Sequence, residues 1–180
     1  MGILDRLMGK GSAAGRAYPA EYFPSVVMLL REPAFPSADE VLIKAQKAWG
    51  AGGRVERVAT MREGASHVLR SASVIYSVHT DASRYGGSVE GGDEILMRPW
   101  NEHRAWMSID MPNARCEQLR RHGVLGDIYK VLLIYAFLSW SESSLGVYFP
   151  AEGITVPSFG ALAESIQWGR RNGLNLSFLN

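Results

Sequence analysis

The sequence has little of what stabilises small secreted domains or draws a protein to a charged surface. Its 180 residues include one cysteine, which excludes an intramolecular disulfide. The 19 Lys and Arg residues against 18 Asp and Glu give a formal net charge of +1, so no overall field attracts nucleic acid or an anionic membrane. Stability therefore has to come from a packed core. With 47% hydrophobic residues, a chain of this length can bury about 70% of its unfolded surface.

Long apolar runs are missing as well. The most apolar stretch, residues 128–140, contains Lys130 and is shorter than the roughly 20 residues that span a bilayer. Asp5 and Arg6 interrupt the apolar run that a secretory signal would need near the N-terminus. The sequence therefore predicts a cytoplasmic protein without a membrane segment, in which Cys116 stays reduced.

Motifs for cofactors and metals are also missing. The sequence has no P-loop and no GxGxxG, GxSxG or HExxH pattern. Its histidines have none of the paired spacings that are typical of zinc ligands; they are His67, His79, His103 and His122. We therefore predict no cofactor, no metal site and no catalytic constellation of a known kind.

Strand and helix signals follow one another irregularly along the chain. The continuous apolar run at 25–31 is typical of a central strand buried on both faces. Ser37 followed by Glu40 forms a capping box, which predicts a helix that ends before the glycines at 50–53. Further strands are predicted at 54–62, 67–69, 73–80 and 103–111, and as a hairpin at 146–150 and 154–157.

The second half of the chain adds helices. Asn113 is a plausible N-cap for a helix from 114, which Gly123 and Gly126 are expected to split from a central buried helix at 127–140. A last helix is predicted at 158–171. Residues 81–102 are rich in glycine, serine and charge, and we expect a long loop there.

These elements favour an α+β fold. Strands and helices do not alternate strictly, which disfavours a doubly wound parallel sheet. We predict a mixed or antiparallel sheet of about six strands, covered by three main helices and opening with a β-α unit. Residues 1–17 are interpreted as a flexible or amphipathic N-terminal segment, and 18–180 as a single domain.

Two patterns carry candidate chemistry. The segment 91–95, Gly-Gly-Asp-Glu-Ile, resembles the signature of diguanylate cyclases, in which the glycines let backbone approach the nucleotide and the acids hold metal. Ile95 stands where that family has an aromatic residue and its earlier Asn-Asp segment is missing, so a polar turn is the competing interpretation. Cys116 near a helix start and His103 at the start of the preceding strand form a candidate nucleophile pair, with a small core cysteine as the alternative.

Two of the five tryptophans are candidates for binding a partner. Trp100 lies in the predicted polar loop, and Trp106 lies on the strand face opposite the apolar one. Exposed tryptophans often anchor protein interfaces, although a helix that covers this face would bury both. Together with Asp93 and Glu94, they are our candidate contact residues for a protein partner.

The chain resembles an uncharacterised bacterial family of small α/β domains of unknown function. The matching features are the strand 26–30 before a capped helix, the strand 103–111, and the run 145–150 followed by a turn and Thr155-Val-Pro. The resemblance implies a fold and no established reaction. Some such domains lie beside secreted-toxin genes and act as immunity proteins.

The leading hypothesis is therefore a non-enzymatic binding protein, most plausibly an immunity protein that neutralises a bacterial toxin by direct occlusion. One alternative is a small hydrolytic or nucleotide-processing enzyme that uses Asp93 and Glu94, or Cys116 and His103. A second alternative is an adaptor or structural component of a bacterial secretion assembly, which homo-oligomerisation would favour.

Overall fold

The computed structural model describes residues 23–49, 54–62, 65–86 and 93–179. The predicted N-terminal segment at 1–17 and the glycines at 50–53 and 91–92 lie outside these residues. The strands are β1 (Ser25–Leu30), β2 (Val55–Arg62), β3 (Ser66–Ser71), β4 (Val74–Asp81), β5 (Ala105–Asp110), β6 (Ser144–Phe149) and β7 (Ile154–Pro157). The helices are α2 (Ala38–Trp49), α3 (Glu94–Glu102), α4 (Cys116–Arg121), α5 (Leu125–Ser139) and α6 (Leu162–Arg171), followed by the short 3-10 helix η3 (Ser177–Leu179).

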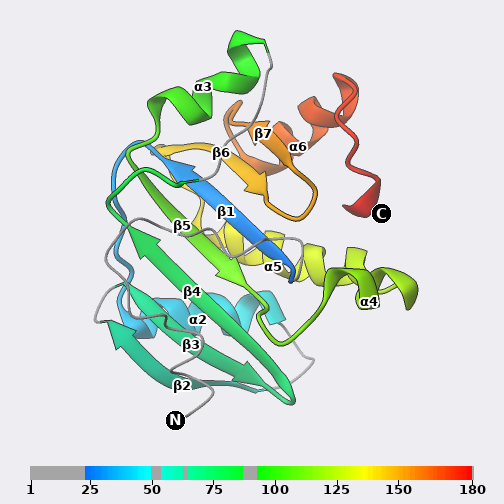
Figure 1. Ribbon diagram of the computed structural model, residues 1–180. Coiled ribbons are helices and arrows are strands. Elements are labelled where there is room, and N and C mark those ends of the chain that lie inside the picture. Colours follow the sequence, from blue (N-terminus) through cyan, green and yellow to red (C-terminus); the bar gives the residue numbers. More distant parts are fainter. Residues whose placement is uncertain (1–22, 50–53, 63–64, 87–92, 180) are drawn as a thin grey trace.

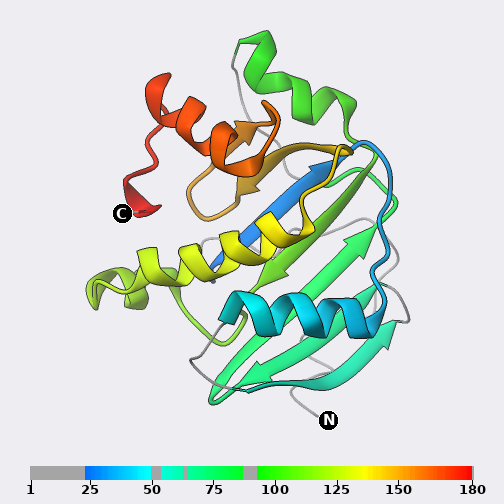
Figure 2. The ribbon, with the colours of Figure 1, turned by 180° about the vertical axis from the view of Figure 1, so that it is seen from behind.

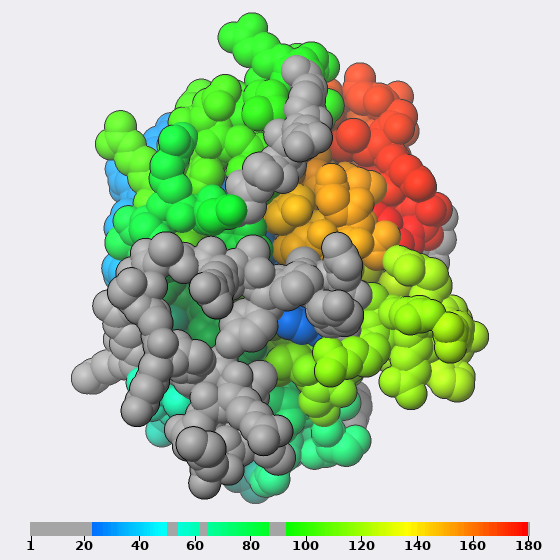
Figure 3. All heavy atoms as spheres, in the orientation of Figure 1, coloured from blue at the N-terminus to red at the C-terminus, as the bar shows by residue number. Residues whose placement is uncertain are grey.

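All the strands form one antiparallel sheet in the order β2-β3-β4-β5-β1-β6-β7 (Figure 1). The predicted α+β class and the opening β-α unit are confirmed. Within the described residues the sheet has seven strands rather than about six, and five α-helices stand where three main ones were predicted. The β6–β7 hairpin is also confirmed. On the surface, it (orange) is a neighbour of α6 (red) at one end of the sheet (Figure 3).

Strand β1 lies in the middle of the sheet, between β5 and β6, as its apolar run predicts. All six of its residues are buried. Side chains alternate along a strand, so Val26, Met28 and Leu30 enter the main core while Val27 and Leu29 enter a second, smaller cluster on the other face. A strand that is apolar on both faces requires cover on both faces.

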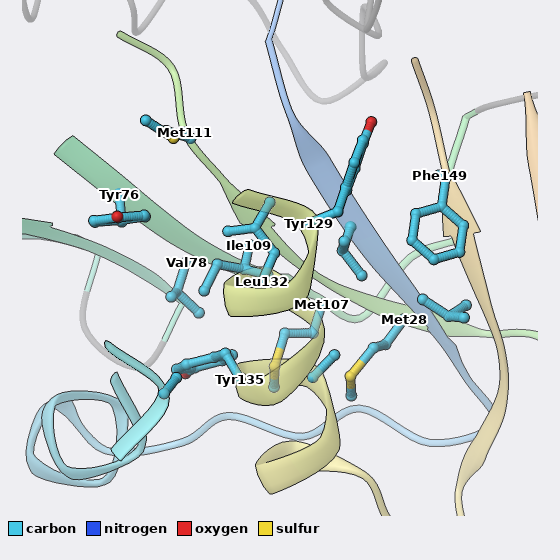
Figure 4. Packing of buried hydrophobic residues seen from close by; sticks show 14 of the residues in the cluster. Met28, Tyr76, Val78, Met107, Ile109, Met111, Tyr129, Leu132, Tyr135 and Phe149 are labelled. Atoms are coloured by element: carbon cyan, nitrogen blue, oxygen red, sulfur yellow. The ribbon is translucent and has the colours of Figure 1, made fainter. Parts of the chain in front are cut away.

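Helices α2 and α5 cover one face of the sheet, which we call the helix face (Figure 2). Tyr129, Leu132 and Tyr135 of α5 point from the helix toward the side chains of the strands (Figure 4). The predicted central buried helix is thus confirmed, but it begins at Leu125, so Gly126 lies inside it rather than before it. At Ser37, the predicted capping box is present, because the Ser37 N–H donates to Glu40 Oε2 at 2.7 Å.

The prediction of a loop over 81–102 is wrong for its second half, which forms α3. Asp93 caps this helix, because its Oδ1 accepts from the N–H of Leu96 at 2.9 Å. Two other helix starts differ from the prediction. Asn113 does not cap α4, because its side chain bonds the backbone of Ser73 and Ile75. The first residue of α6 is Leu162, four residues after the predicted start.

Helix α5 spans 15 residues. Among the described residues, no helix combines the length and the apolarity that a membrane crossing requires.

Candidate functional site

The face of the sheet opposite α2 and α5, which we call the open face, has two unlike halves. Figure 1 is viewed from this side. Helix α3 packs over β1, β6 and β7, and we call this part the covered half. The strands β3, β4 and β5, with the first residue of β1, carry polar side chains on the same face, and we call this part the polar half.

The covered half is a small second core. Trp100 and Met97 of α3 pack on Val27, Leu29 and Tyr148. Trp100 is only 7% exposed. Its indole N–H donates to the Thr155 hydroxyl at 2.8 Å, so both its ring and its polar atom are satisfied inside the protein.

Two residues fix the end of α3 onto the sheet. The Arg84 guanidinium donates to the carbonyl oxygens of Trp100 and His103, at 3.0 and 3.2 Å, and also to that of Asn101. These carbonyls belong to the last turn of α3 and the residue after it, where a cation is favourable. The His103 ring contacts the carbonyls of Pro99 and Trp100 through Nδ1 and accepts the Tyr85 N–H through Nε2 at 2.9 Å.

The polar half is built from two neighbouring rows of side chains. In one row, Ser66, His79 and Ser108 lie opposite one another on β3, β4 and β5. In the next row, Ser77, Asp110 and Ser25 lie opposite one another on β4, β5 and β1. Opposed residues of antiparallel strands point to the same face, so all six converge.

The Asp110 carboxylate is the centre of this arrangement. The Ser25 hydroxyl donates to Oδ1 at 2.5 Å, and the Ser108 hydroxyl donates to Oδ2 at 2.8 Å. Burial raises the pKa of the Asp110 carboxyl above its ordinary value, while a charge on His79 and hydroxyl donors, including that of Ser77, oppose the rise. Asp110 is therefore a carboxyl group with several neutral donors, and among the described residues its close potential counter-ion is His79, 3.9 Å away.

Ser66, His79 and Asp110 follow one another in the order of a hydrolytic relay. Ser66 Oγ lies 2.7 Å from His79 Nδ1, and His79 Nε2 lies 3.9 Å from Asp110 Oδ2. The second distance is too long for a hydrogen bond. The Ser66 residue is also buried, which would hinder the approach of a substrate to its hydroxyl. The arrangement therefore departs from the geometry of a catalytic triad.

Aromatic rings border the polar half on the side of α3. The Tyr85 and Trp106 rings meet edge to face, with centroids 5.3 Å apart, and Tyr85 also contacts Tyr148 at 6.0 Å. Burial raises the pKa of Tyr85 to about 12, and the negative charge of Asp110 contributes to the rise. The two rings therefore lie between the covered core and the carboxylate.

Of the four predicted contact residues, only Trp106 borders the polar half. It is half-buried and faces Tyr85, whereas Trp100 is buried in the covered half and does not lie in an exposed loop. Asp93 and Glu94 are exposed at the start of α3, with one Asp93 oxygen used for capping. The structure thus does not bring the four together in one patch.

The candidate pair Cys116 and His103 is not assembled. The two residues lie beyond opposite ends of β5. Burial lowers the pKa of His103, whose Nδ1 contacts carbonyls of α3 and whose Nε2 accepts the Tyr85 N–H. Burial raises the pKa of the buried Cys116 thiol, which disfavours a reactive thiolate.

A shallow recess of about 640 Å³ lies where β1 ends and β5 begins. Arg31, Arg84 and Arg104 line it, together with Glu32 and Glu102. Arg84 is engaged by α3, and Arg31 pairs with Glu102 at 3.4 Å, so two of its three cations have internal partners. Among the described residues, no group of three or more potential ligands could hold a metal ion.

Sequence reasoning missed the central residues of the polar half. Their signal was present, because Ser77 and His79 alternate with apolar residues on one strand, as Ser108 and Asp110 do on another. Comparisons with known proteins give no match: none for the family models, the curated proteins or the solved structures.

Proposed function

We propose that this chain is a non-enzymatic binding protein that holds a protein partner on the polar half of its open face. The observation that carries the proposal is the contrast between the two faces of one sheet. Helices α2 and α5 cover the helix face and α3 covers part of the other, while the polar half has no helix over it among the described residues. The polar half carries hydrogen-bonding side chains beside two aromatic rings, and this composition is suited to a protein interface.

The partner class that we propose is a bacterial toxin, whose active site this surface would occlude. The resemblance of the sequence to a bacterial family with members beside toxin genes supports this class. A rigid sheet supports it as well, because occlusion needs a surface that changes little on binding.

Co-expression tests the proposal. The product of a toxin-like open reading frame adjacent to the gene is expressed in a bacterial host with and without this chain. We expect the chain to restore growth and to form a stoichiometric complex. Val68→Arg places a bulky charge on the polar half, beside Ser77, and should abolish both effects. Ala163→Arg on the exposed side of α6 is the matched control and should abolish neither.

If the two arginine variants protect equally well, the binding surface lies elsewhere on the protein. No protection and no complex with the wild-type chain would overturn the proposal itself. Thermal melting of both variants identifies a loss of function that arises from misfolding.

Hydrolysis is the competing function, and the 2.7 Å contact between Ser66 Oγ and His79 Nδ1 is the observation that favours it. A fluorophosphonate probe, which phosphonylates activated serines, distinguishes the two functions. We expect no labelling of the full chain. Labelling that disappears in Ser66→Ala would replace the binding proposal by catalysis.

A further inference from the structure

We infer that the polar half receives a lysine or arginine side chain of the protein partner, with the Asp110 carboxylate as its counter-ion. This inference rests on the proposed function, and it names the chemistry that the partner must present. Three properties of the site carry it: its charge, its hydrogen-bonding capacity and its aromatic border.

The charge of the surface favours a cation. The open-face positions of β1, β3, β4 and β5 include two carboxylates, Asp81 and Asp110. Arg70, on β3, is the one arginine or lysine among these positions, and Glu56 already pairs with it at 3.0 Å. Among the described residues, the potential cation within 4 Å of Asp110 is His79, whose Nε2 is 3.9 Å away and therefore outside hydrogen-bond distance.

Asp110 keeps capacity for an incoming donor. An ionised carboxylate accepts about four hydrogen bonds, and three serine hydroxyls donate to this one. Each hydroxyl that donates to the carboxylate still has lone pairs that can accept. Ammonium and guanidinium groups carry donors only, so they match a site that consists mainly of acceptors.

The shape of the site selects a long side chain. The Asp110 side chain is only 13% exposed, so a slender group must reach it. Lysine and arginine carry their charge at the end of an apolar stem, which can lie along the Tyr85 and Trp106 rings. A cation close to these rings gains a further attraction from their π faces. A protein side chain fits better than a free cation, because only the side chain carries an apolar stem that can lie against the rings.

Titration of the full chain with blocked tripeptides tests this inference. The probes are acetyl-Gly-Arg-Gly-amide, acetyl-Gly-Lys-Gly-amide, acetyl-Gly-Glu-Gly-amide and methylguanidinium, and the reporter is the NMR signal of the Trp106 indole N–H. We expect the two basic peptides to shift this signal with millimolar dissociation constants. The Glu peptide should have no effect, and methylguanidinium should bind several-fold more weakly than the Arg peptide.

Two variants locate the binding on Asp110. Asp110→Asn should lower the affinity for the basic peptides at least tenfold. Asp127 is an exposed carboxylate on α5, so Asp127→Asn is the matched control and should leave the affinity unchanged. Tyr85→Leu keeps the carboxylate and the reporter and should weaken binding about threefold. This second variant keeps the test valid if Asp110→Asn does not fold.

Three results would overturn the inference: no shift at Trp106, an equal response to the Glu peptide, or equal affinity for methylguanidinium, which would point to a small-molecule amine. These failures are distinct from failure of the proposed function. If the toxin complex forms, is lost in Val68→Arg and is unaffected by Asp110→Asn, the binding function stands and the basic side chain is wrong.

Discussion

The two halves of the open face share strands but use them differently. On β1 and β5, Leu29 and Trp106 lie opposite each other on the covered side, and Ser25 and Asp110 lie opposite each other at the polar end. The first pair belongs to the cluster that α3 closes, while the second pair is joined by a hydroxyl–carboxylate bond. A strand thus contributes to packing at one end and carries hydrogen-bonding side chains at the other. If this division is correct, substitutions in the covered half should cost stability and those in the polar half should cost binding.

Trp100→Ala should have the largest effect on stability. The substitution removes the side chain that anchors α3 and leaves the Thr155 hydroxyl without its donor. Large-to-small changes of buried aromatic residues cost about 3–5 kcal/mol, and urea unfolding would measure this loss. Trp100→Phe, which keeps a ring but not the indole N–H, should cost less than half as much. A loss below about 1 kcal/mol for the alanine variant would show that α3 is not an integral part of the fold.

Gly146→Ala should have the next largest effect. A Cβ at this position would lie 2.8 Å from the Val156 carbonyl oxygen and 3.0 Å from Pro99 Cγ, so β7 or α3 would have to move. Overpacking of this kind costs about 1–3 kcal/mol in thermal or urea unfolding.

Gly153→Ala is the control for backbone strain alone. Gly153 has a φ of 65° and open space around the Cβ position. The Gly153→Ala substitution should lower the stability of the protein without moving α3. Only Gly146→Ala is expected to shift the NMR signal of the Trp100 indole N–H, and an unchanged signal would contradict the close approach of Pro99.

Elements with a strong local signal could be predicted from the sequence, and elements without one could not. The central strand, the capped helix α2, the buried helix α5 and the β6–β7 hairpin were predicted because each has a local signal: an apolar run, a capping box, helical spacing or a turn between two short strands. Helix α3 has weak local signals. Pro99 lies inside it, and its apolar side becomes evident only when Met97 and Trp100 meet the sheet.

The polar half depends even more on tertiary structure. Serine, histidine and aspartate were each visible at alternate positions of single strands, but they meet only because β5 lies between β4 and β1 in the correct register. Strand order is not encoded by composition or periodicity. The predicted contact residues were therefore individual candidates, and of these only Trp106 borders the site.

Acid should lower the stability of the protein, through one histidine on each side of the sheet. Burial lowers the pKa of His103, and of His67 on the helix face, so both histidines are neutral in the folded protein near neutral pH. Such groups contribute stability that is present above the ordinary histidine pKa of 6.5 and is lost as the pH falls toward the folded-state value. We expect the urea midpoint to fall between about pH 7.5 and about pH 5. The fall should be smaller in His103→Gln, and an unchanged fall would exclude His103 as a contributor.

Asp110→Asn should have the smallest effect on stability, although Asp110 is the centre of the polar half. Burial raises the pKa of its carboxyl, so ionised Asp110 costs stability, and this cost grows as the pH rises above the ordinary value of 3.8. Asn removes the charge, and its amide oxygen still accepts a hydrogen bond from one of the serine hydroxyls. The two effects oppose each other, and we expect a change of less than about 1 kcal/mol, more favourable to Asn at about pH 7 than at about pH 4. Ser108→Ala is the companion variant, because it removes one donor from Asp110 and keeps the charge. A loss of several kcal/mol in Asp110→Asn would make the polar half a structural network, and the contrast between the two halves would then disappear.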